Sequence, residues 1–162
     1  PLFSADTEVR NLYKKKSFIR FISKKFNLSY RSNIRKYLRE KILKDKKNIK
    51  KLEKIIHPLV RSQMQKFIKK NKRQKLLFFE IPLLIESKLM KNFNLIIFIK
   101  AKKKIRLKRF ISKGGNKKLF NILNKKQFKD SKKAKFCDYV IVNEKNIEVL
   151  KKNLKVIMQT YE

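Results

Sequence analysis

Apolar residues are spaced in two different ways along this chain of 162 residues. In the segments 9–43 and 52–68 they recur every three or four positions, which places them on one face of a helix. In the segments 76–84, 95–99 and 139–142 they follow one another almost without a break. Such runs are typical of strands in a parallel sheet that is covered on both faces. The pattern therefore predicts helices that alternate with buried parallel strands.

The two ends of the chain fit the same alternation. The opening Pro1–Ala5 is short and apolar, and the acidic Asp6 and Glu8 that follow suit the first turn of a helix. A strand that leads directly into a helix is therefore predicted at the start. Further helices are predicted over 101–113, 117–128 and 147–161, with the only two glycines, Gly114 and Gly115, between the first two.

Two interruptions divide the long helical part between the first and second strands. The pattern weakens near Asn27–Ser29, so 9–43 is expected to form two or three helices. At His57–Pro58 we expect a bend or a helix start, because proline disfavours helical geometry in the residue before it. The sequence as a whole predicts an α/β domain with a mainly parallel sheet and a helical insertion.

The charge of the chain is the next feature. The 47 Lys and Arg residues outnumber the 12 Asp and Glu residues, which gives a formal net charge of +35. An excess of this size is found in proteins that bind nucleic acids, and that alternative stays open. However, 38 of the 47 basic residues are Lys, they are spread along the whole chain, and no recognised nucleic-acid-binding motif occurs. AT-rich codons produce the same composition, so a solvated Lys-rich surface is the simpler interpretation.

Several classes of site are disfavoured by the residue counts. The single cysteine, Cys137, excludes an internal disulfide, and the single histidine, His57, argues against a histidine-based metal site. No apolar run is long enough to span a membrane. The chain opens at Pro1 without a signal-peptide pattern, and we expect it to be part of a longer cytoplasmic protein.

Candidate chemical groups follow the predicted strands, because the carboxyl ends of parallel strands meet at one edge of a sheet. Asp6 follows the first strand, the segment 80–86 ends the second, and Asn143 ends the last. From its position alone, Asp6 is either a helix cap or a catalytic carboxylate.

Basic side chains form two helical patterns. Arg106, Arg109 and Lys113 stand at i, i+3 and i+7, which is either a clamp for an anionic ligand or a solvated helix face. His57 and Arg61 are one turn apart and can face one ligand, although His57 can equally be structural. A G-x-x-x-x-G-K-[ST] phosphate loop does not occur in these residues.

Four segments carry a family resemblance when they are taken together. Phe3–Asp6, Leu52–Arg61, Phe79–Glu86 and Asp138–Asn143 occur in the order, the intervals and the strand contexts found in dephospho-CoA kinases. The sequence therefore resembles that family over essentially its whole length. The resemblance implies a P-loop NTPase-like parallel sheet with helices on both faces, in a single domain over 1–162. It also implies a helical CoA-binding insertion over about 14–75 and a short helical lid over about 106–133.

The resemblance also implies a reaction. Dephospho-CoA kinases use ATP and Mg²⁺ to phosphorylate the ribose 3′-hydroxyl of dephospho-CoA, the last step of CoA synthesis. Family members carry a glycine-rich phosphate loop ahead of the segment that Phe3–Asp6 matches, and we expect residues 1–162 to transfer phosphate poorly without it. The expected partners are the two small-molecule substrates, with no membrane and no specific nucleic acid. An inactive remnant that only binds CoA-like ligands is a further alternative.

Individual roles follow from the matched motifs. Asp6 matches the last acid of the family's Asp-Ala-Asp segment, with Ser4 in place of the first, and is expected to accept the hydroxyl proton or to organise Mg²⁺. Arg109 matches a lid cation and is the second expected catalytic residue, and Lys113 stands where the family more often has Arg. No metal-ligand set is predicted. The expected substrate-binding residues are His57, Pro58, Arg61, Pro82, Leu83 and Glu86, and the expected nucleotide and lid residues are Arg106, Lys113, Gln127, Lys133 and Asn143.

Overall fold

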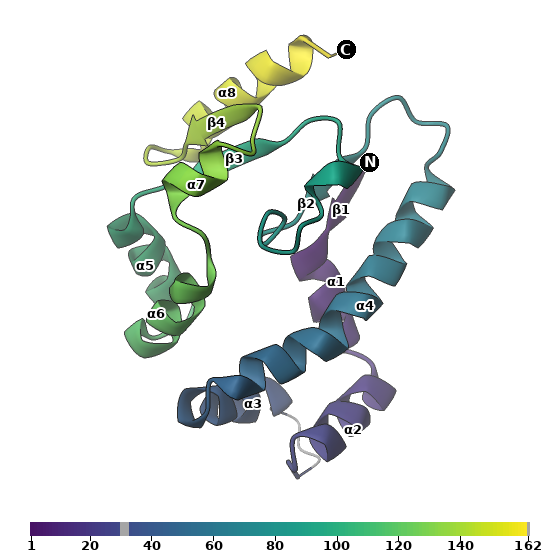
Figure 1. Ribbon diagram of the computed structural model, residues 1–162, viewed down its shortest axis with the longest axis vertical. Helices are drawn as coiled ribbons and strands as arrows, with labels where there is room; N and C mark the ends of the chain where they lie inside the picture. The colour runs from purple at the N-terminus through teal and green to yellow at the C-terminus, as the bar shows by residue number, and fades with distance from the viewer. Residues whose placement is uncertain (30–32, 162) are drawn as a thin grey trace. The chain divides into compact units, whose positions relative to one another are not determined.

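The protein is represented by a computed structural model that describes residues 1–29 and 33–161. Residues 30–32, which fall in the predicted insertion, lie outside the described residues. The chain divides into two compact units, Pro1–Pro82 and Leu83–Glu162, hereafter the first and the second unit. Each contains a two-stranded parallel sheet and its own helices (Figure 1). An α/β fold with parallel strands, as the sequence predicts, is confirmed.

The first unit begins with the predicted strand that leads directly into a helix. Strand β1 (Leu2–Ser4) pairs in parallel with β2 (Phe78–Glu80), with Phe3 opposite Phe79. The helices between them are α1 (Ala5–Leu12), α2 (Lys16–Lys25), α3 (Ile34–Lys44) and α4 (Lys47–Lys70). Three of these helices lie within the first 44 residues, so the expectation of two or three helices there is confirmed.

An apolar core holds the first unit together. Ile22 of α2 is fully buried, and the helices α1 and α3 both pack against α4 (Figure 1). Burial of one such side chain stabilises a fold by about 1.5–3 kcal/mol. Phe3 of β1, Phe67 of α4 and Phe79 of β2 form a triangle with ring centroids 5.5–5.9 Å apart, which fastens α4 to the sheet. The core cluster consists of Leu12, Phe18, Ile22, Phe26, Ile34, Leu38 and Ile56.

Helix α4 runs through Pro58 without interruption, so the prediction of a helix start at His57–Pro58 is wrong, and the alternative of a bend within the helix stays a prediction. Proline has no N–H and removes one hydrogen bond from a helix interior. Ile56 and Val60 on either side of Pro58 pack against the same apolar core. Tertiary packing on both sides of the proline therefore outweighs its local preference.

The second unit contains the remaining predicted strands and helices. Strand β3 (Ile97–Lys100) pairs in parallel with β4 (Tyr139–Val142). A short 3-10 helix, η1 (Met90–Asn92), precedes β3. The helices are α5 (Lys103–Ser112), α6 (Lys117–Lys126), α7 (Asp130–Ala134) and α8 (Ile147–Gln159). The far part of the expected lid is thus two helices, because the extended backbone of Gln127 ends α6 before α7 begins.

The glycine pair ends α5 as the sequence predicts. Gly114 has a φ of +78°, a left-handed conformation that favours glycine, and its N–H donates to the Ile111 carbonyl at 2.9 Å. A Cβ atom on Gly115 would collide with the Phe110 ring. Both positions therefore require glycine for the tight return from α5 to α6.

The strands are less buried than their apolar sequences predict. Phe78 of β2 is 39% exposed, and Val140 and Val142 of β4 are 45% and 52% exposed. The prediction that these runs are buried on both faces is therefore wrong in the described structure. Each sheet has only two strands, and helices such as α8 on β4 cover only part of each face. Within the described residues, no helix is both long and apolar enough to cross a lipid bilayer.

Candidate functional site

Asp6 lies at the junction of β1 and α1. The Oγ atom of Ser4 accepts a hydrogen bond from the backbone N–H of Thr7 at 3.3 Å, so Ser4 caps α1. The alternative that Asp6 is the cap is therefore wrong. The exposed Asp6 carboxylate lies in the first turn of the helix, where the partial positive charge of the helix end favours an anion.

Glu80 is a second carboxylate at the same edge of this sheet. It ends β2 and lies opposite Ser4 in the strand register, so it stands beside the start of α1. Sequence reasoning included Glu80 only as part of a loop segment. The signal that identifies it is the register of the two strands, which a single sequence does not reveal.

His57, Pro58 and Arg61 all lie on α4 in the first unit. Because α4 is continuous, His57 and Arg61 are separated by one helical turn and share a face. Arg61 and Pro58 are exposed, and His57 is half-buried. The helix therefore presents a cation to solvent on the same face as the imidazole, as the sequence predicts.

Four expected site residues of the second unit form one polar cluster. The side chains of Glu86 and Lys133 are joined by an ion pair of 3.0 Å, although they are only 11% and 8% exposed. The Oε1 atom of Gln127 accepts from Lys133 Nζ and from Arg106 Nη1, both at 3.5 Å. The structure thus brings together Glu86, Arg106, Gln127 and Lys133, hereafter the lid cluster.

Arg106 is held by several further acceptors. Its guanidinium donates to the Ala101 carbonyl at 3.1 Å and to Asn124 Oδ1 at 3.0 Å, and it lies 3.9 Å from Asp130. Arg106 therefore does not belong to a solvated basic stripe. Sequence reasoning missed its partners Asn124 and Asp130, because no motif or spacing distinguishes them.

Arg109 and Asn143 form a separate pair at the carboxyl end of β4. Arg109 Nη1 donates to the backbone carbonyl of Asn143 at 3.1 Å, and Nη2 donates to its Oδ1 at 3.5 Å. The backbone N–H of Asn143 in turn donates to the carbonyl of Lys100, the last residue of β3, at 2.7 Å. These contacts fix an exposed guanidinium at the edge of the second sheet, where it is able to bind an anion.

The other expected residues have simpler positions. Pro82 is exposed and Leu83 half-buried in the turn that leads to Glu86. Lys113 is exposed at the C-terminal end of α5. Cys137 is not among the expected site residues; burial raises the pKa of its thiol and the Asp138 charge raises it further, which disfavours the reactive thiolate. The Cys137 Sγ atom donates to the Lys133 carbonyl at 3.2 Å.

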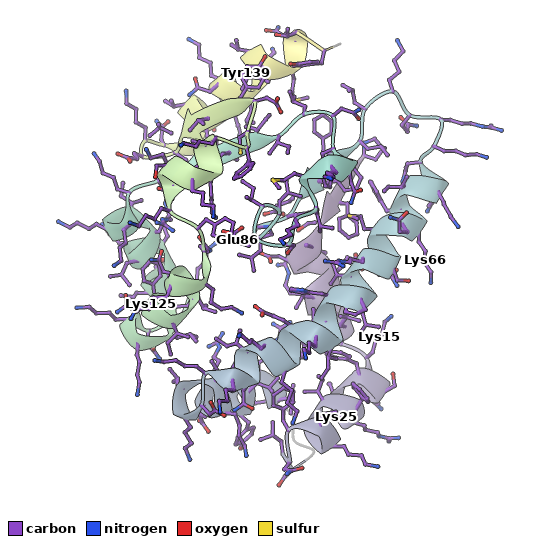
Figure 2. All side chains as sticks on the ribbon, viewed as in Figure 1. Lys15, Lys25, Lys66, Glu86, Lys125 and Tyr139 are labelled. Carbon is purple, nitrogen blue, oxygen red and sulfur yellow. The ribbon has the colours of Figure 1, made fainter. Side chains whose placement is uncertain are left out.

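The positive charge is distributed over both units. Figure 2 labels Lys15 before α2, Lys25 at its end, Lys66 on α4 and Lys125 on α6, and all four are exposed. The distribution matches the interpretation of a Lys-rich solvated surface.

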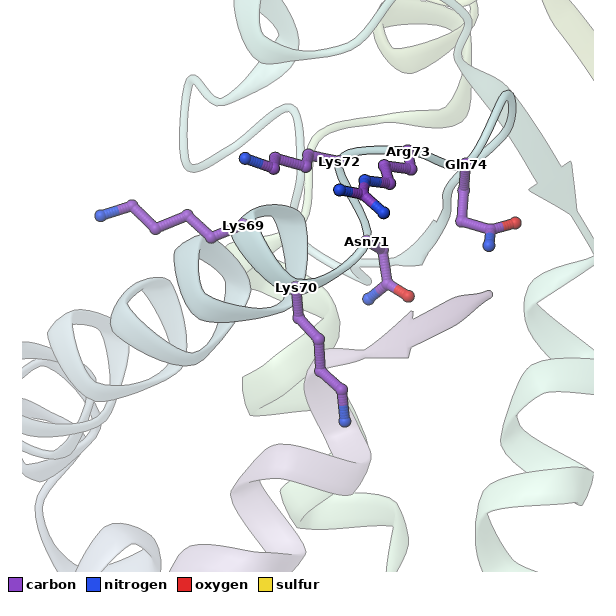
Figure 3. Close-up of a pocket in the computed structure, with 6 residues that line it drawn as sticks. All are labelled: Lys69, Lys70, Asn71, Lys72, Arg73 and Gln74. Carbon is purple, nitrogen blue, oxygen red and sulfur yellow. The ribbon is translucent and has the colours of Figure 1, made fainter.

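One pocket lies away from the expected site residues. It has a volume of about 340 Å³ and is formed by the end of α4 and the turn after it (Figure 3). Four of its six lining residues are cationic, which favours an anionic occupant. Its lining residues are Lys69, Lys70, Asn71, Lys72, Arg73 and Gln74.

Metal ligands are scarce in this structure. The described residues contain no group of three or more His, Cys, Asp or Glu side chains able to hold a metal ion. Mg²⁺ in kinases is commonly held by one or two carboxylates together with substrate phosphates. A single carboxylate such as Asp6 fits that kind of site and not a metal site built of protein ligands alone.

Comparisons with known proteins agree on one family. Residues 10–148 match the sequence model of dephospho-CoA kinase. The dephospho-CoA kinase of Bartonella henselae is 32% identical over 164 residues, which cover 98% of this chain and 84% of that protein. The enzyme of the same name from Bartonella quintana is 34% identical over 152 residues, which cover 91% and 78%.

Solved structures show the same fold. A dephospho-CoA kinase from Campylobacter jejuni aligns with a TM-score of 0.62 at 25% identity and covers 99% of this chain and 84% of that one. The crystal structure of TT1252 from Thermus thermophilus aligns with a TM-score of 0.70 at 22% identity, covering 100% and 85%.

Proposed function

This chain belongs to the dephospho-CoA kinase family, and on that premise we propose that the full-length protein phosphorylates dephospho-CoA with ATP. In this reaction the ribose 3′-hydroxyl oxygen bonds to the γ-phosphorus of ATP as the bond to the β-phosphate oxygen breaks. The products are CoA and ADP. The observation that carries the proposal is the family match over 10–148, together with 32% identity to a relative across 98% of the chain. A reaction that consumes ATP also fits a cytoplasmic protein.

Asp6 is proposed as the group that takes the hydroxyl proton. Its carboxylate is exposed at the carboxyl end of β1, the edge of a parallel sheet where substrates usually bind. A base needs to lie within hydrogen-bond reach of the proton it removes, and it contributes about 10²–10⁴-fold to the rate. The replacement of the family's first Asp by Ser4 leaves Asp6 to act as the only carboxylate of that segment.

Arg109 is proposed as the cation that stabilises the phosphates. Its fork of N–H groups is anchored on Asn143 at 3.1 Å and remains exposed, so it is pre-oriented toward an anion. Lys113, one turn further along the same face of α5, supplies a second positive charge without a planar fork. Mg²⁺, when it arrives with ATP, supplies further neutralisation of the phosphate charge.

The substrate side is proposed to lie on α4. Arg61 and His57 share one face of this helix, and Arg61 is a suitable partner for the phosphate groups of dephospho-CoA. Pro82 and Leu83 are proposed to contact dephospho-CoA as well. The segment 106–133 would close over the nucleotide and exclude water, which otherwise competes with the ribose hydroxyl as acceptor.

The variant Asp6→Asn tests the chemical role directly. In the full-length protein we expect kcat to fall by about 10²–10⁴-fold, because the amide does not accept the proton. The dissociation constant of dephospho-CoA, measured by calorimetry, should change by no more than a few-fold. Glu8→Gln, which removes the other acid of the same helical turn, is the matched control and should leave kcat unchanged. Unchanged turnover in Asp6→Asn would remove Asp6 from the mechanism.

A further inference from the structure

The ion pair between Glu86 and Lys133 joins segments that are far apart in the sequence. Glu86 lies in the turn after β2, and Lys133 lies in α7. The Oε1 atom of Glu86 accepts from Lys133 Nζ at 3.0 Å and also from the backbone N–H of Phe128 at 2.9 Å. A single carboxylate oxygen therefore fastens both α7 and the link between α6 and α7 to this turn.

The pair is enclosed by other parts of the second unit. Lys133 is 6% exposed as a residue, and its Nζ lies 5.7 Å from the centre of the Phe98 ring of β3. The other carboxylate oxygen of Glu86, Oε2, is buried and has no hydrogen-bond partner among the described residues. Charges so enclosed have little surface with which to touch a substrate. Removal of one partner would leave the other charge buried and unpaired.

A chain of contacts leads from this pair to the lid cation. Lys133 Nζ donates to Gln127 Oε1 at 3.5 Å, and the same oxygen accepts from Arg106 Nη1 at 3.5 Å. Both contacts are long, so each is weak alone and depends on where Gln127 is held. Gln127 directly precedes Phe128, whose N–H is bound by Glu86. Glu86 therefore controls the position of the acceptor that Arg106 uses.

We propose that Glu86 and Lys133 are positioning residues that hold α6 and α7 in their nucleotide-binding arrangement. These two helices (117–134), hereafter the lid segment, are the far part of the proposed lid. This proposal rests on the proposed function and gives Glu86 a different role from the substrate contact that its motif suggests. Buried ion pairs often add little net stability, because desolvation of the two charges offsets their attraction. The contribution of this pair is geometric: it sets the position of Gln127, which is one of the acceptors that Arg106 uses.

The test uses three variants of the full-length protein. Glu86→Gln keeps an acceptor for the Phe128 N–H and removes the charge, and Lys133→Met keeps the length of the side chain and removes the charge. The double variant removes both charges and leaves no buried ion. Glu148→Gln and Lys151→Met form the control, because that pair has a similar distance of 3.1 Å but side chains that are 66–70% exposed.

We expect each single variant to speed amide hydrogen exchange in 117–134 by about tenfold or more without a comparable change in α8. The KM for ATP should rise by about tenfold, while the KM for dephospho-CoA stays within about twofold. The double variant should recover a melting temperature within a few degrees of the wild type, because it buries no unpaired charge. It should not recover the KM for ATP, because a methionine side chain has no donor for Gln127. The control variants should match the wild type.

Several results would overturn the proposal. A rise in the KM for dephospho-CoA alone would make Glu86 a substrate contact, and recovery of the ATP KM together with stability in the double variant would make the pair merely structural. Hydrogen exchange that is unchanged, or faster throughout the second unit, would contradict local positioning.

If the wild-type protein makes no CoA, the proposed function fails on that result. The exchange pattern of the ligand-free protein then still decides whether the pair holds the lid segment.

Discussion

The two units of this protein differ in the contacts found within each of them: both bury apolar side chains, and the second unit adds carboxylate contacts between distant segments. In the first unit, buried aliphatic and aromatic side chains such as Ile22 and Phe3 carry the packing. In the second unit, three acidic side chains each accept a backbone N–H from a segment 42 residues away. These contacts are Asp138 to Ile96 at 2.7 Å, Glu86 to Phe128 at 2.9 Å and Glu144 to Lys102 at 3.1 Å.

Because of this difference, the stability of each unit should respond differently to substitutions. Apolar burial is non-directional, so many sequences with the right periodicity produce a core like that of the first unit. Carboxylate contacts are directional and depend on single residues. In a chain with 12 acidic residues and 47 basic ones, each carboxylate of the second unit is hard to replace. The first unit should therefore be sensitive to cavities, and the second to loss of individual acids.

The largest effect on stability is expected from a cavity in the first unit. Ile22→Ala should lower the free energy of unfolding by about 3–5 kcal/mol, because Ile22 is fully buried and its removal leaves a void. Urea unfolding followed by circular dichroism measures this loss. Phe21→Ala, at a neighbouring position of α2 that is 45% exposed, is the control and should cost less than about 1 kcal/mol. Equal losses in the two variants would contradict the core described above.

A smaller effect is expected from a carboxylate of the second unit. Asp138→Ala should lower the free energy of unfolding by about 1–2 kcal/mol, because the Ile96 N–H loses a charged acceptor at 2.7 Å. Asp138→Asn retains an acceptor oxygen and should recover at least half of the loss. If Asn behaves like Ala, the contact between these two segments does not stabilise the second unit.

The smallest effect concerns the pH dependence of Glu144. A hydrogen bond and an ion pair of 3.0 Å with Lys102 lower the pKa of this carboxyl below its usual value of 4.5. A carboxyl group whose pKa is lowered in the folded state stabilises the fold at pH values above its unfolded pKa. This stabilisation is lost as the pH falls through the folded pKa. Wild type should therefore exceed Glu144→Gln in stability at pH 7 and lose that advantage at pH 3. Salt should reduce the difference, because the pair is exposed to solvent. A difference independent of pH would assign the contact to packing instead of charge.

Much of the fold was predictable from local patterns. Unbroken apolar runs predict three of the four described strands, and the short apolar opening followed by acidic residues predicts β1 and the helix after it. The glycine pair predicts the break after α5. These features depend on neighbouring residues, whose preferences a sequence displays directly. The course of α4 through Pro58 was not predictable in this way, because its cause is packing of Ile56 and Val60 against a core formed by other helices.

The sequence allowed candidate site residues to be named, but it did not predict the contacts between them. The family motifs select Asp6, Arg109 and Asn143, and the structure adds that Arg109 binds Asn143 directly. The family resemblance places Lys133 in the lid, but nothing in the sequence predicts that this lysine is buried, because its burial depends on Glu86, which lies 47 positions earlier. The cap of α1 by Ser4 was likewise hidden, since Asp6 is an equally suitable cap residue.

The most direct test of the account is to incubate the full-length protein with ATP and dephospho-CoA and to analyse the products by mass spectrometry and phosphorus NMR. The account predicts one ADP for each CoA, with the new phosphate on the ribose 3′-hydroxyl. It also predicts loss of that product in Asp6→Asn but not in Glu8→Gln. Hydrolysis of ATP without a phosphorylated acceptor, or phosphate on any other hydroxyl, would contradict it.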